Sequence, residues 1–332
     1  MKADVVFGAQ YGDEGKGKII SYFASKKYYS AYVRAGVGPN AGHSVYHNGK
    51  KFALRQLPSG FLDSDAELYI GAGVLVNPKV LFDEIKNLEI DKGRVHIDYN
   101  TGIITEEHLN LEMASEQAKV IGTTKTGCGP AMEERVKRKL KLAKDYSELK
   151  DFLCNVREEL EKHSKVLVEG SQGFMLSNYH GTYPYVTSKD TSVSAFLSDV
   201  GIGPKAVNEI IMVMKSYTTR VGNGPLKNEL TIDEIKKYGL EEYGTVTGRM
   251  RRVSKDLHFD DLRKAVMMNT PTCIALTKLD VLFSEVKGLK NFAELCKVSE
   301  NAFKFIEKIE AELKVKVKYI GTGQNDDELI VR

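Results

Sequence analysis

Residues 12–18 read Gly12-Asp13-Glu14-Gly15-Lys16-Gly17-Lys18 and follow a short apolar run at residues 5–7. The spacing fits the Gly-x4-Gly-Lys part of a phosphate-binding loop. Glycines let backbone N–H groups crowd around phosphate oxygens, and the lysines add positive charge. A helix that follows such a loop directs its N-terminus at the bound anion. The stretch therefore predicts a strand, a phosphate loop and a helix at the start of an α/β fold.

The loop departs from the standard pattern at its metal ligand. Position 19 is isoleucine, where a standard phosphate loop has the serine or threonine that holds Mg²⁺. Besides Glu14, Asp13 is the only hard anionic ligand that the loop offers. We therefore expect Asp13 to take part in holding the magnesium ion.

A second motif, Thr277-Lys278-Leu279-Asp280, follows the apolar run at residues 273–276. GTP-binding proteins use an Asn/Thr-Lys-x-Asp loop at such a place. The aspartate accepts two hydrogen bonds, from N1–H and from the 2-amino group of guanine. The lysine stem can lie along the face of the base. Together with the phosphate loop, this motif predicts that the chain binds GTP.

A regulatory GTPase also needs an Asp-x-x-Gly sequence that senses the γ-phosphate, and no aspartate in this chain is followed by that spacing. A GTPase switch is therefore disfavoured. The two motifs leave several classes open. Two of them are an NTP-dependent ligase with a phosphate loop and a non-catalytic GTP-binding module.

Further apolar runs at residues 166–168, 210–214 and 315–320 also end in small and polar residues. Open α/β sheets bind ligands at the carboxyl ends of their strands, so we expect the chemistry in the loops that follow these runs. Apolar residues at helical spacing predict helices at residues 147–163 and 299–313. We expect one elaborated α/β domain over residues 1–332, with a central, mostly parallel sheet and flanking helices.

The composition of the chain indicates its compartment and excludes some classes of partner. The 332 residues carry a net charge of +3, and no block of like charge indicates a nucleic-acid partner. None of the four cysteines forms a Cys-x-x-Cys pair, which favours isolated thiols in a reducing compartment. Neither a signal-peptide pattern nor a membrane-length apolar run is present. We therefore expect a cytoplasmic protein with no membrane partner.

Many motifs in a fixed order then resemble the adenylosuccinate synthetase family. They are residues 10–18, 39–43, 57–60, 121–131, 169–173, 180–188, 217–222, 247–252, 277–280 and 321–323. The chain resembles a short form of the family, with Tyr11 where most members have tryptophan. Further departures are Lys125-Thr126 for the usual Gly-Arg, residues 253–256 for the usual Cys-Gly-Trp-Phe/Leu, and Gln324 for the usual proline.

The resemblance implies the activity and the catalytic residues. Members of the family join L-aspartate to IMP, with GTP as co-substrate and one Mg²⁺ per subunit, through 6-phosphoryl-IMP. Asp13 would be the base and a magnesium ligand, and His43 would be the acid. The carbonyl group of Gly42 would complete the protein's share of the metal site.

The resemblance also implies three sets of binding residues and a homodimer. The residues expected at GTP are Gly12, Asp13, Glu14, Gly15, Lys16, Gly17, Lys18, Gly42, His43, Ser44, Arg251, Lys278, Leu279, Asp280, Gly321, Thr322 and Gly323. Those expected at IMP are Asp13, Glu14, Gly15, Lys16, Asn40, Ala41, Gly42, His43, Thr124, Arg138, Gln172, Thr187, Val221 and Arg249. Those expected at aspartate are Thr245, Val246, Thr247, Gly248, Arg249, Met250 and Arg251. Arg138, in the basic, helix-like run 133–141, would cross the dimer interface to the IMP phosphate of the neighbouring subunit.

Overall fold

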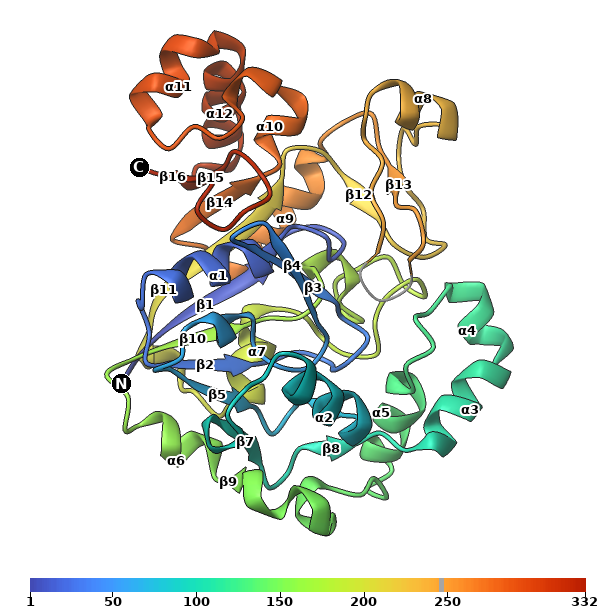
Figure 1. Ribbon diagram of the computed structural model, residues 1–332. Helices are drawn as coiled ribbons and strands as arrows, with labels where there is room; N and C mark the ends of the chain where they lie inside the picture. Colours follow the sequence, from blue (N-terminus) through green and yellow to red (C-terminus); the bar gives the residue numbers. More distant parts are fainter. Residues whose placement is uncertain (245–247) are drawn as a thin grey trace.

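A ten-stranded sheet forms the centre of the computed structural model, which describes residues 1–244 and 248–332 (Figure 1). The strand order is β16-β15-β14-β11-β1-β10-β2-β5-β7-β9. All neighbours are parallel except β16, which pairs antiparallel with β15. The strands are β1 (Lys2–Gly8), β2 (Ala31–Arg34), β5 (Glu67–Ile70), β7 (Val95–Asp98), β9 (Leu153–Cys154), β10 (Lys165–Glu169), β11 (Val207–Lys215), β14 (Cys273–Thr277), β15 (Val317–Gly321) and β16 (Leu329–Val331). The mostly parallel sheet that the sequence predicts is confirmed.

Helices cover both faces of this sheet, and alternate strand residues enter two separate hydrophobic clusters. Val5 and Phe7 of β1 belong to one cluster, whereas Val6 belongs to the other. The cluster of Val6 lies under α1 (Lys16–Ser25) and α2 (Pro78–Asn87). The cluster of Val5 lies under α7 (Val193–Asp199), α9 (Phe259–Asn269), α11 (Phe292–Val298) and α12 (Glu300–Leu313). Burial on both faces explains why the central strands contain continuous apolar runs, such as Val5-Val6-Phe7 in β1.

Three two-stranded ribbons and several helices extend from this core. The ribbons pair β3 (His43–His47) with β4 (Lys50–Leu54), β6 (Leu75–Val76) with β8 (Gly102–Ile103), and β12 (Thr219–Arg220) with β13 (Arg252–Val253). The other helices are α3 (Glu106–Ala114), α4 (Glu116–Ile121), α5 (Cys128–Val136), α6 (Val156–Leu160), α8 (Ile232–Lys237) and α10 (Leu279–Leu282). Short 3-10 helices are η1 (Ser59–Leu62), η2 (Lys92–Arg94), η3 (Ala143–Asp145), η4 (Ser147–Phe152), η5 (Phe174–Leu176), η6 (Pro204–Ala206) and η7 (Ser284–Val286).

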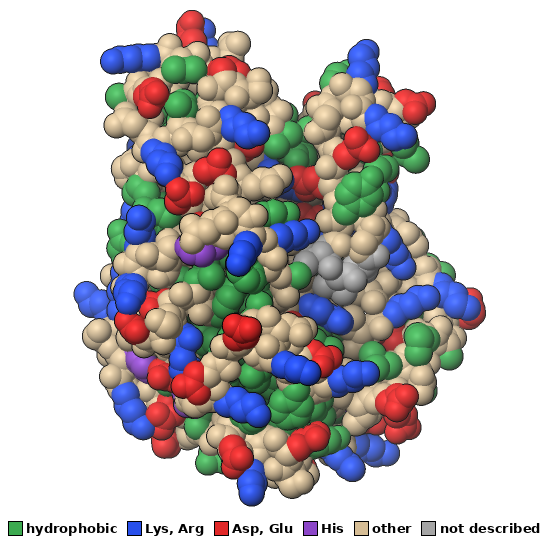
Figure 2. All heavy atoms as spheres, in the orientation of Figure 1, with side chains coloured by type: hydrophobic (Ala, Val, Ile, Leu, Met, Phe, Trp, Pro, Cys, Tyr) green, Lys and Arg blue, Asp and Glu red, His purple; other side chains and the backbone are tan. Residues whose placement is uncertain are grey.

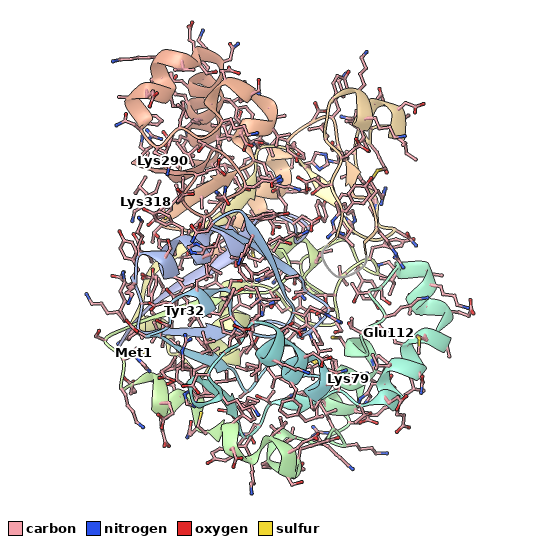
Figure 3. The ribbon with its side chains drawn as sticks, in the orientation of Figure 1. Met1, Tyr32, Lys79, Glu112, Lys290 and Lys318 are labelled. Atoms are coloured by element: carbon pink, nitrogen blue, oxygen red, sulfur yellow. The ribbon has the colours of Figure 1, made fainter. Side chains whose placement is uncertain are left out.

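Two lobes rise from the sheet, and the surface is hollowed between them. One lobe contains α10, α11 and α12, and the other contains β12, β13 and α8 (Figures 1 and 2). Helices α3, α4 and α5 form an arm beside the second lobe, and Glu112 marks it in Figure 3. Basic and acidic side chains are interspersed over the face drawn in Figure 2. Within the described ranges, the structure contains no helix of the length and apolar character that a bilayer crossing requires.

The helix expected at residues 147–163 is wrong. The segment instead contains η4, the two-residue strand β9 and the short helix α6. Residues 153 and 154 pair with β7 at the edge of the sheet, and Asn155 then caps α6 by accepting from Glu158 N. Leu149, Phe152, Val156 and Leu160, which suggested a helix, are still buried, and Leu153 is partly buried, so strand pairing has overridden their periodicity.

The other two helix expectations have different outcomes. Ser299 caps α12, which spans Glu300–Leu313, so the helix expected at residues 299–313 is confirmed. The helix-like run 133–141 is helical only as far as Val136, the last residue of α5. Arg138 then has a left-handed backbone with φ of 61°, which an α-helix cannot contain.

Candidate nucleotide and ligation site

The phosphate loop connects β1 to α1, as the sequence predicts. Gly12 and Gly15 have φ values of 106° and 87°, which side chains with a Cβ rarely adopt. Helix α1 begins at Lys16, so the last residues of the motif form its first turn. The N-terminus of a ten-residue helix therefore faces a cavity with a volume of about 320 Å³, which is named the smaller cavity.

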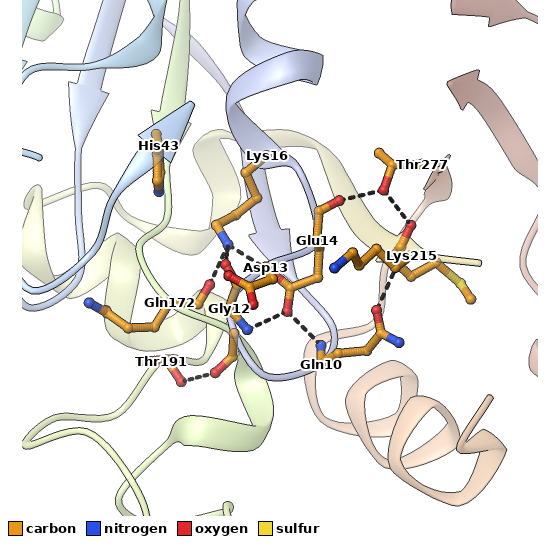
Figure 4. Close-up of polar contacts among 12 residues, drawn as sticks. Gln10, Gly12, Asp13, Glu14, Lys16, His43, Gln172, Thr191, Lys215 and Thr277 are labelled. Carbon is orange, nitrogen blue, oxygen red and sulfur yellow. Dashed lines mark hydrogen bonds and ion pairs between the residues drawn. The ribbon is translucent and has the colours of Figure 1, made fainter. Parts of the chain in front are cut away.

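Glu14 braces the loop from inside. Its side chain is fully buried, and its Oε1 accepts from the backbone N–H groups of Gln10 and Gly12 at 2.9 and 2.8 Å. Its Oε2 pairs with Lys16 Nζ at 2.9 Å, and this lysine also donates to the carbonyl oxygen of Gln172 (Figure 4). The side chain of Glu14 therefore holds the loop in shape, and its backbone is the part that remains for a ligand.

Asp13 lies beside a cation. Arg251 Nε is 2.6 Å from Asp13 Oδ2, and the two side chains are 11% and 18% exposed. Burial raises the pKa of Asp13, although the charges of Arg251 and Lys215 oppose the shift. A carboxylate with a raised pKa is a better base than one in water, so the position suits proton removal.

His43 starts β3 and belongs to a buried charged cluster. Its Nδ1 lies 2.7 Å from Arg34 Nη1 and also contacts Glu169 Oε1. Burial, and then Arg34, lower the pKa of His43 to about 4. Within the described residues, the buried Nε2 has no hydrogen-bond partner. A neutral ring that accepts from Arg34 at Nδ1 carries its hydrogen on Nε2, whereas a neutral ring that donates to Glu169 from Nδ1 has no hydrogen there. A protonated ring carries a hydrogen on both nitrogens.

The larger cavity has a volume of about 460 Å³ and gathers residues from distant parts of the chain. Gln172 Nε2 donates to Asn40 Oδ1 at 2.8 Å, and Asn40 Nδ2 donates to Thr187 Oγ1 at 3.2 Å. The sequence predicts all three at one ligand, and the structure brings them together. Other predicted residues on the cavity wall are Gly12, Asp13, Ala41, Gly42, His43, Thr124, Val221 and Arg251.

The guanine motif ends β14 and borders the smaller cavity. Thr277 Oγ1 donates to the carbonyl oxygen of Glu14 at 2.6 Å, which joins this motif to the phosphate loop. Lys278 lies on the cavity wall. Asp280 Oδ1 is buried without a hydrogen-bond partner among the described residues, and burial raises the pKa of this carboxyl. A buried acceptor without a partner is costly, so this atom is suited to an incoming donor.

The C-terminal loop follows β15 and approaches the phosphate loop. Gly323 lies on the wall of the smaller cavity, and Lys18 Nζ donates to the carbonyl oxygen of Asn325. Burial lowers the pKa of Lys18 to about 8. Thr322 is fully buried, and its hydroxyl donates to Leu289 O at 2.8 Å, so its side chain faces away from the cavity.

Several predicted residues lie apart from both cavity walls. Leu279 is fully buried beneath the guanine motif, and Gly321 precedes Thr322 at the end of β15. Arg138 is exposed, just beyond α5. Arg249 contacts Gly122 O at 3.4 Å from the exposed surface. Gly248 and Met250 lie on the same segment, whereas Thr245, Val246 and Thr247 fall outside the described residues.

Sequence reasoning missed three charged residues that end buried strands. Arg34 ends β2, Glu169 ends β10 and Lys215 ends β11, and each is at most 1% exposed. Burial alone would raise the pKa of Glu169, but Arg34 and His43 outweigh it and hold the pKa at about 2. The sequence does contain a signal for these residues, which is a charged residue at the carboxyl end of an apolar run. Such a charge is buried only beside a partner of opposite charge, so it indicates a polar site.

These features define a class, the α/β enzymes that bind a nucleotide at a phosphate loop and hold a second ligand beside it. The adenylosuccinate synthetase family model matches residues 5–163 and 140–290. The chain belongs to that family, whose activity is the GTP-dependent ligation of L-aspartate to IMP.

The relatives match over almost the whole chain. The adenylosuccinate synthetase of Methanococcus aeolicus is 50% identical over 330 residues, which cover 97% of each chain. That of Methanocaldococcus jannaschii is 51% identical over 330 residues, which cover 97% of this chain and 94% of the relative. The fully ligated adenylosuccinate synthetase of Plasmodium falciparum has a TM-score of 0.91, with 30% identity and full coverage of both chains.

Proposed function

We propose that this chain carries out the family's ligation where its two cavities meet, with Asp13 as base and His43 as acid. The observation that supports this proposal is that both side chains border both cavities. A γ-phosphoryl group in the smaller cavity and a purine oxygen in the larger one would meet at that boundary. The chemistry requires such a meeting, because the 6-oxo group of IMP leaves poorly until it is phosphorylated.

Asp13 begins the reaction. Its carboxylate removes the proton from N1 of IMP, and the electron pair moves to the 6-oxygen, which attacks the γ-phosphorus of GTP. GDP leaves, and 6-phosphoryl-IMP remains. The amine of aspartate then displaces phosphate from C6. Arg251, 2.6 Å from Asp13, opposes the rise in the pKa of this carboxyl that burial causes.

His43 stabilises the charge that develops on the 6-oxygen. A hydrogen on Nε2 would donate to that oxygen, while Nδ1 is held by Arg34 and Glu169. Negative charge close to the ring favours the protonated imidazole, so a bound oxyanion raises the pKa of His43 above its value in the free protein. Glu169 fixes the ring and balances its positive charge.

The proposed Mg²⁺ site fits the donors at the cavity boundary. The carboxylate of Asp13 and the carbonyl group of Gly42 are hard oxygen ligands, and both residues border both cavities. Magnesium is usually held by one or two protein oxygens together with phosphates and water. When bound, the ion would neutralise phosphate charge during phosphoryl transfer.

Each of the three substrates is proposed to contact a different set of residues. IMP occupies the larger cavity, held by Asn40, Gln172 and Thr187, and GTP extends from the phosphate loop to Asp280. The segment that includes Gly248 and Arg251 takes the carboxylates of aspartate, because guanidinium groups bind carboxylates with two hydrogen bonds. Lys278 lies against the guanine face.

The exposed position of Arg138 supports a proposal about the assembly. This exposed residue lies outside both cavity walls of its own subunit, which supports a role in the site of a second copy. We propose a cytoplasmic homodimer in which each chain is one α/β domain and Arg138 reaches the IMP phosphate of the neighbour.

A GDP-release assay that omits one substrate at a time tests the proposed function. The complete mixture should release GDP and form adenylosuccinate, and omission of IMP should stop GDP release. A different NTP-dependent ligase would turn over without IMP, and a GTP-binding module would bind GTP without substrate-dependent release. Either result would exclude the proposed reaction.

A further inference from the structure

Glu242 places a partly buried carboxylate on the wall of the smaller cavity, and the proposed reaction gives it no role. Its side chain is 16% exposed and contacts three groups from other segments. Its Oε2 accepts from Lys215 Nζ at 2.5 Å. Its Oε1 accepts from the Tyr217 hydroxyl at 2.5 Å and lies 3.3 Å from Lys278 Nζ. Each carboxylate oxygen is therefore occupied, and one of them holds the lysine of the guanine motif.

The charges at this carboxylate are matched. Burial alone would raise the pKa of Glu242, but Lys215 and Lys278 outweigh it and hold the pKa at about 2. Lys215 is only 2% exposed on its side chain, and its Nζ also donates to Thr219 Oγ1 at 2.8 Å. Glu242 is therefore ionised at neutral pH and pairs with the buried Lys215 charge.

The backbone of Glu242 makes a second connection. Its carbonyl oxygen accepts from Arg251 N at 2.7 Å, and Gly244 N donates to Arg249 O at 2.9 Å. Tyr243 and Met250 form an antiparallel bridge between these contacts. The segment that holds Arg251 beside Asp13 is therefore fixed in position against residue 242.

Lys278 is fixed from its own side as well. Its backbone has a φ of 62°, a left-handed conformation that is strained for lysine. Ser216 Oγ holds this conformation by donating to Lys278 O at 2.7 Å. With the backbone fixed, the contact with Glu242 determines where the ammonium end of the side chain lies.

We propose that Glu242 is a positioning residue that couples guanine recognition to the aspartate-binding segment. Its carboxylate aligns Lys278 with the purine of the nucleotide, and its carbonyl oxygen aligns the segment that carries Arg251. The inference rests on the proposed function for the identity of the three substrates. The nucleotide-binding measurement tests the contact between Glu242 and Lys278 independently of the proposed function.

Calorimetric titration with GDP, without IMP or aspartate, tests the first half of the proposal in the full-length protein. Glu242→Gln should raise the Kd for GDP by about tenfold, because Lys278 loses its charged partner. In a Lys278→Met background the same change should alter the Kd by less than about twofold, since the residue through which Glu242 acts is gone. Additive effects in the double variant would overturn this half.

Steady-state kinetics test the second half. Glu242→Gln weakens the ion pair with Lys215 that fixes residue 242, and with it the carbonyl oxygen that accepts from Arg251 N. It should therefore raise the KM for aspartate by about tenfold, also in the Lys278→Met background, and should change the KM for IMP by less than about threefold. An equal rise in all three KM values would indicate general loosening and would overturn the proposal, as would unchanged constants. A wild-type protein without IMP-dependent turnover would instead contradict the proposed function and leave the GDP titration valid.

Two further variants make the result specific. Glu310→Gln is the matched control, because Glu310 is 13% exposed and pairs with Arg332 at 2.6 Å and Lys316 at 3.2 Å, away from both cavity walls. It should leave all constants unchanged. Glu242→Asp keeps the charge beside Lys215 but shortens the side chain. If Glu242→Gln does not fold, the shift in Kd for GDP is measured in Glu242→Asp, where it should be about threefold in the same direction.

Discussion

The phosphate loop and the arm of α3, α4 and α5 both supply predicted site residues, but they are built differently. In the loop, Glu14 and Lys16 are buried and bonded to each other, and Thr277 ties the loop to the guanine motif. On the arm side, Arg138 is exposed beyond the end of α5. The loop is therefore held by bonds among its own residues and Thr277, whereas the role of Arg138 rests on the proposed second copy of the chain.

The largest effect is expected at Asp13, in the preformed region. Asp13→Asn should lower kcat by about 10⁴-fold, because it removes both the base and an anionic metal ligand. The fold should be unchanged by circular dichroism, since Asp13 contacts Arg251 and does not brace the loop as Glu14 does. Retention of more than a few per cent of kcat would contradict the assignment of the base.

A second prediction concerns the choice of nucleotide. The uncompensated Oδ1 of Asp280 should accept from guanine, and Asp280→Asn should offer an NH₂ donor to the carbonyl group that xanthine has there. The ratio of kcat/KM for GTP to that for XTP should fall by about 10²–10⁴-fold. The measurement is made in both proteins at saturating IMP and aspartate. An unchanged ratio would mean that Asp280 does not read the base.

A third prediction concerns Arg138, the exposed residue beyond α5. Arg138→Leu and Asp13→Ala homodimers should each be inactive, and a mixture of the two should recover activity, because one site of each mixed dimer contains both native residues. Random exchange places about a quarter of the sites in that state. If native mass spectrometry confirms the mixed dimers and turnover is still absent, the shared site is wrong.

The smallest effect is expected on stability. His43 is neutral when buried, with a pKa near 4 compared with about 6.5 in an unfolded chain. The unfolded state therefore binds the proton first, so stability should decrease as the pH falls from 6.5 towards 4, by on the order of 3 kcal/mol. Over this pH interval the His43→Asn variant should lose less free energy of unfolding than the wild-type protein. The measurement is a urea titration of both proteins at each pH. Parallel losses in both proteins would contradict the buried neutral state.

The difference between these regions also explains what the sequence could predict. The phosphate loop and the guanine motif are local patterns whose spacing is set by backbone geometry, and both lie where the sequence places them. Asn40, Gln172 and Thr187 are far apart in the chain and were predicted only from the order of family motifs, yet they share one hydrogen-bonded chain.

The misses have physical causes. The helix at residues 147–163 failed because pairing of Leu153 and Cys154 with β7 outweighed a helical apolar spacing. Glu169 was predicted only as part of a family motif without a role, and Glu242 was not predicted, because their partners, Arg34 and Lys215, lie 135 and 27 residues away. Long-range ion pairs leave no local spacing in a sequence. The structure reveals them because buried charges must be matched.

The central claim is that phosphoryl transfer takes place on the 6-oxygen of IMP between Asp13 and His43. IMP labelled with ¹⁸O at position 6 tests it directly, with mass spectrometry of the products. The account predicts that the inorganic phosphate carries the label, because the C6–O bond breaks after the oxygen has joined phosphorus. Unlabelled phosphate, with adenylosuccinate still formed, would show that the oxygen leaves by another route and would contradict the proposed mechanism.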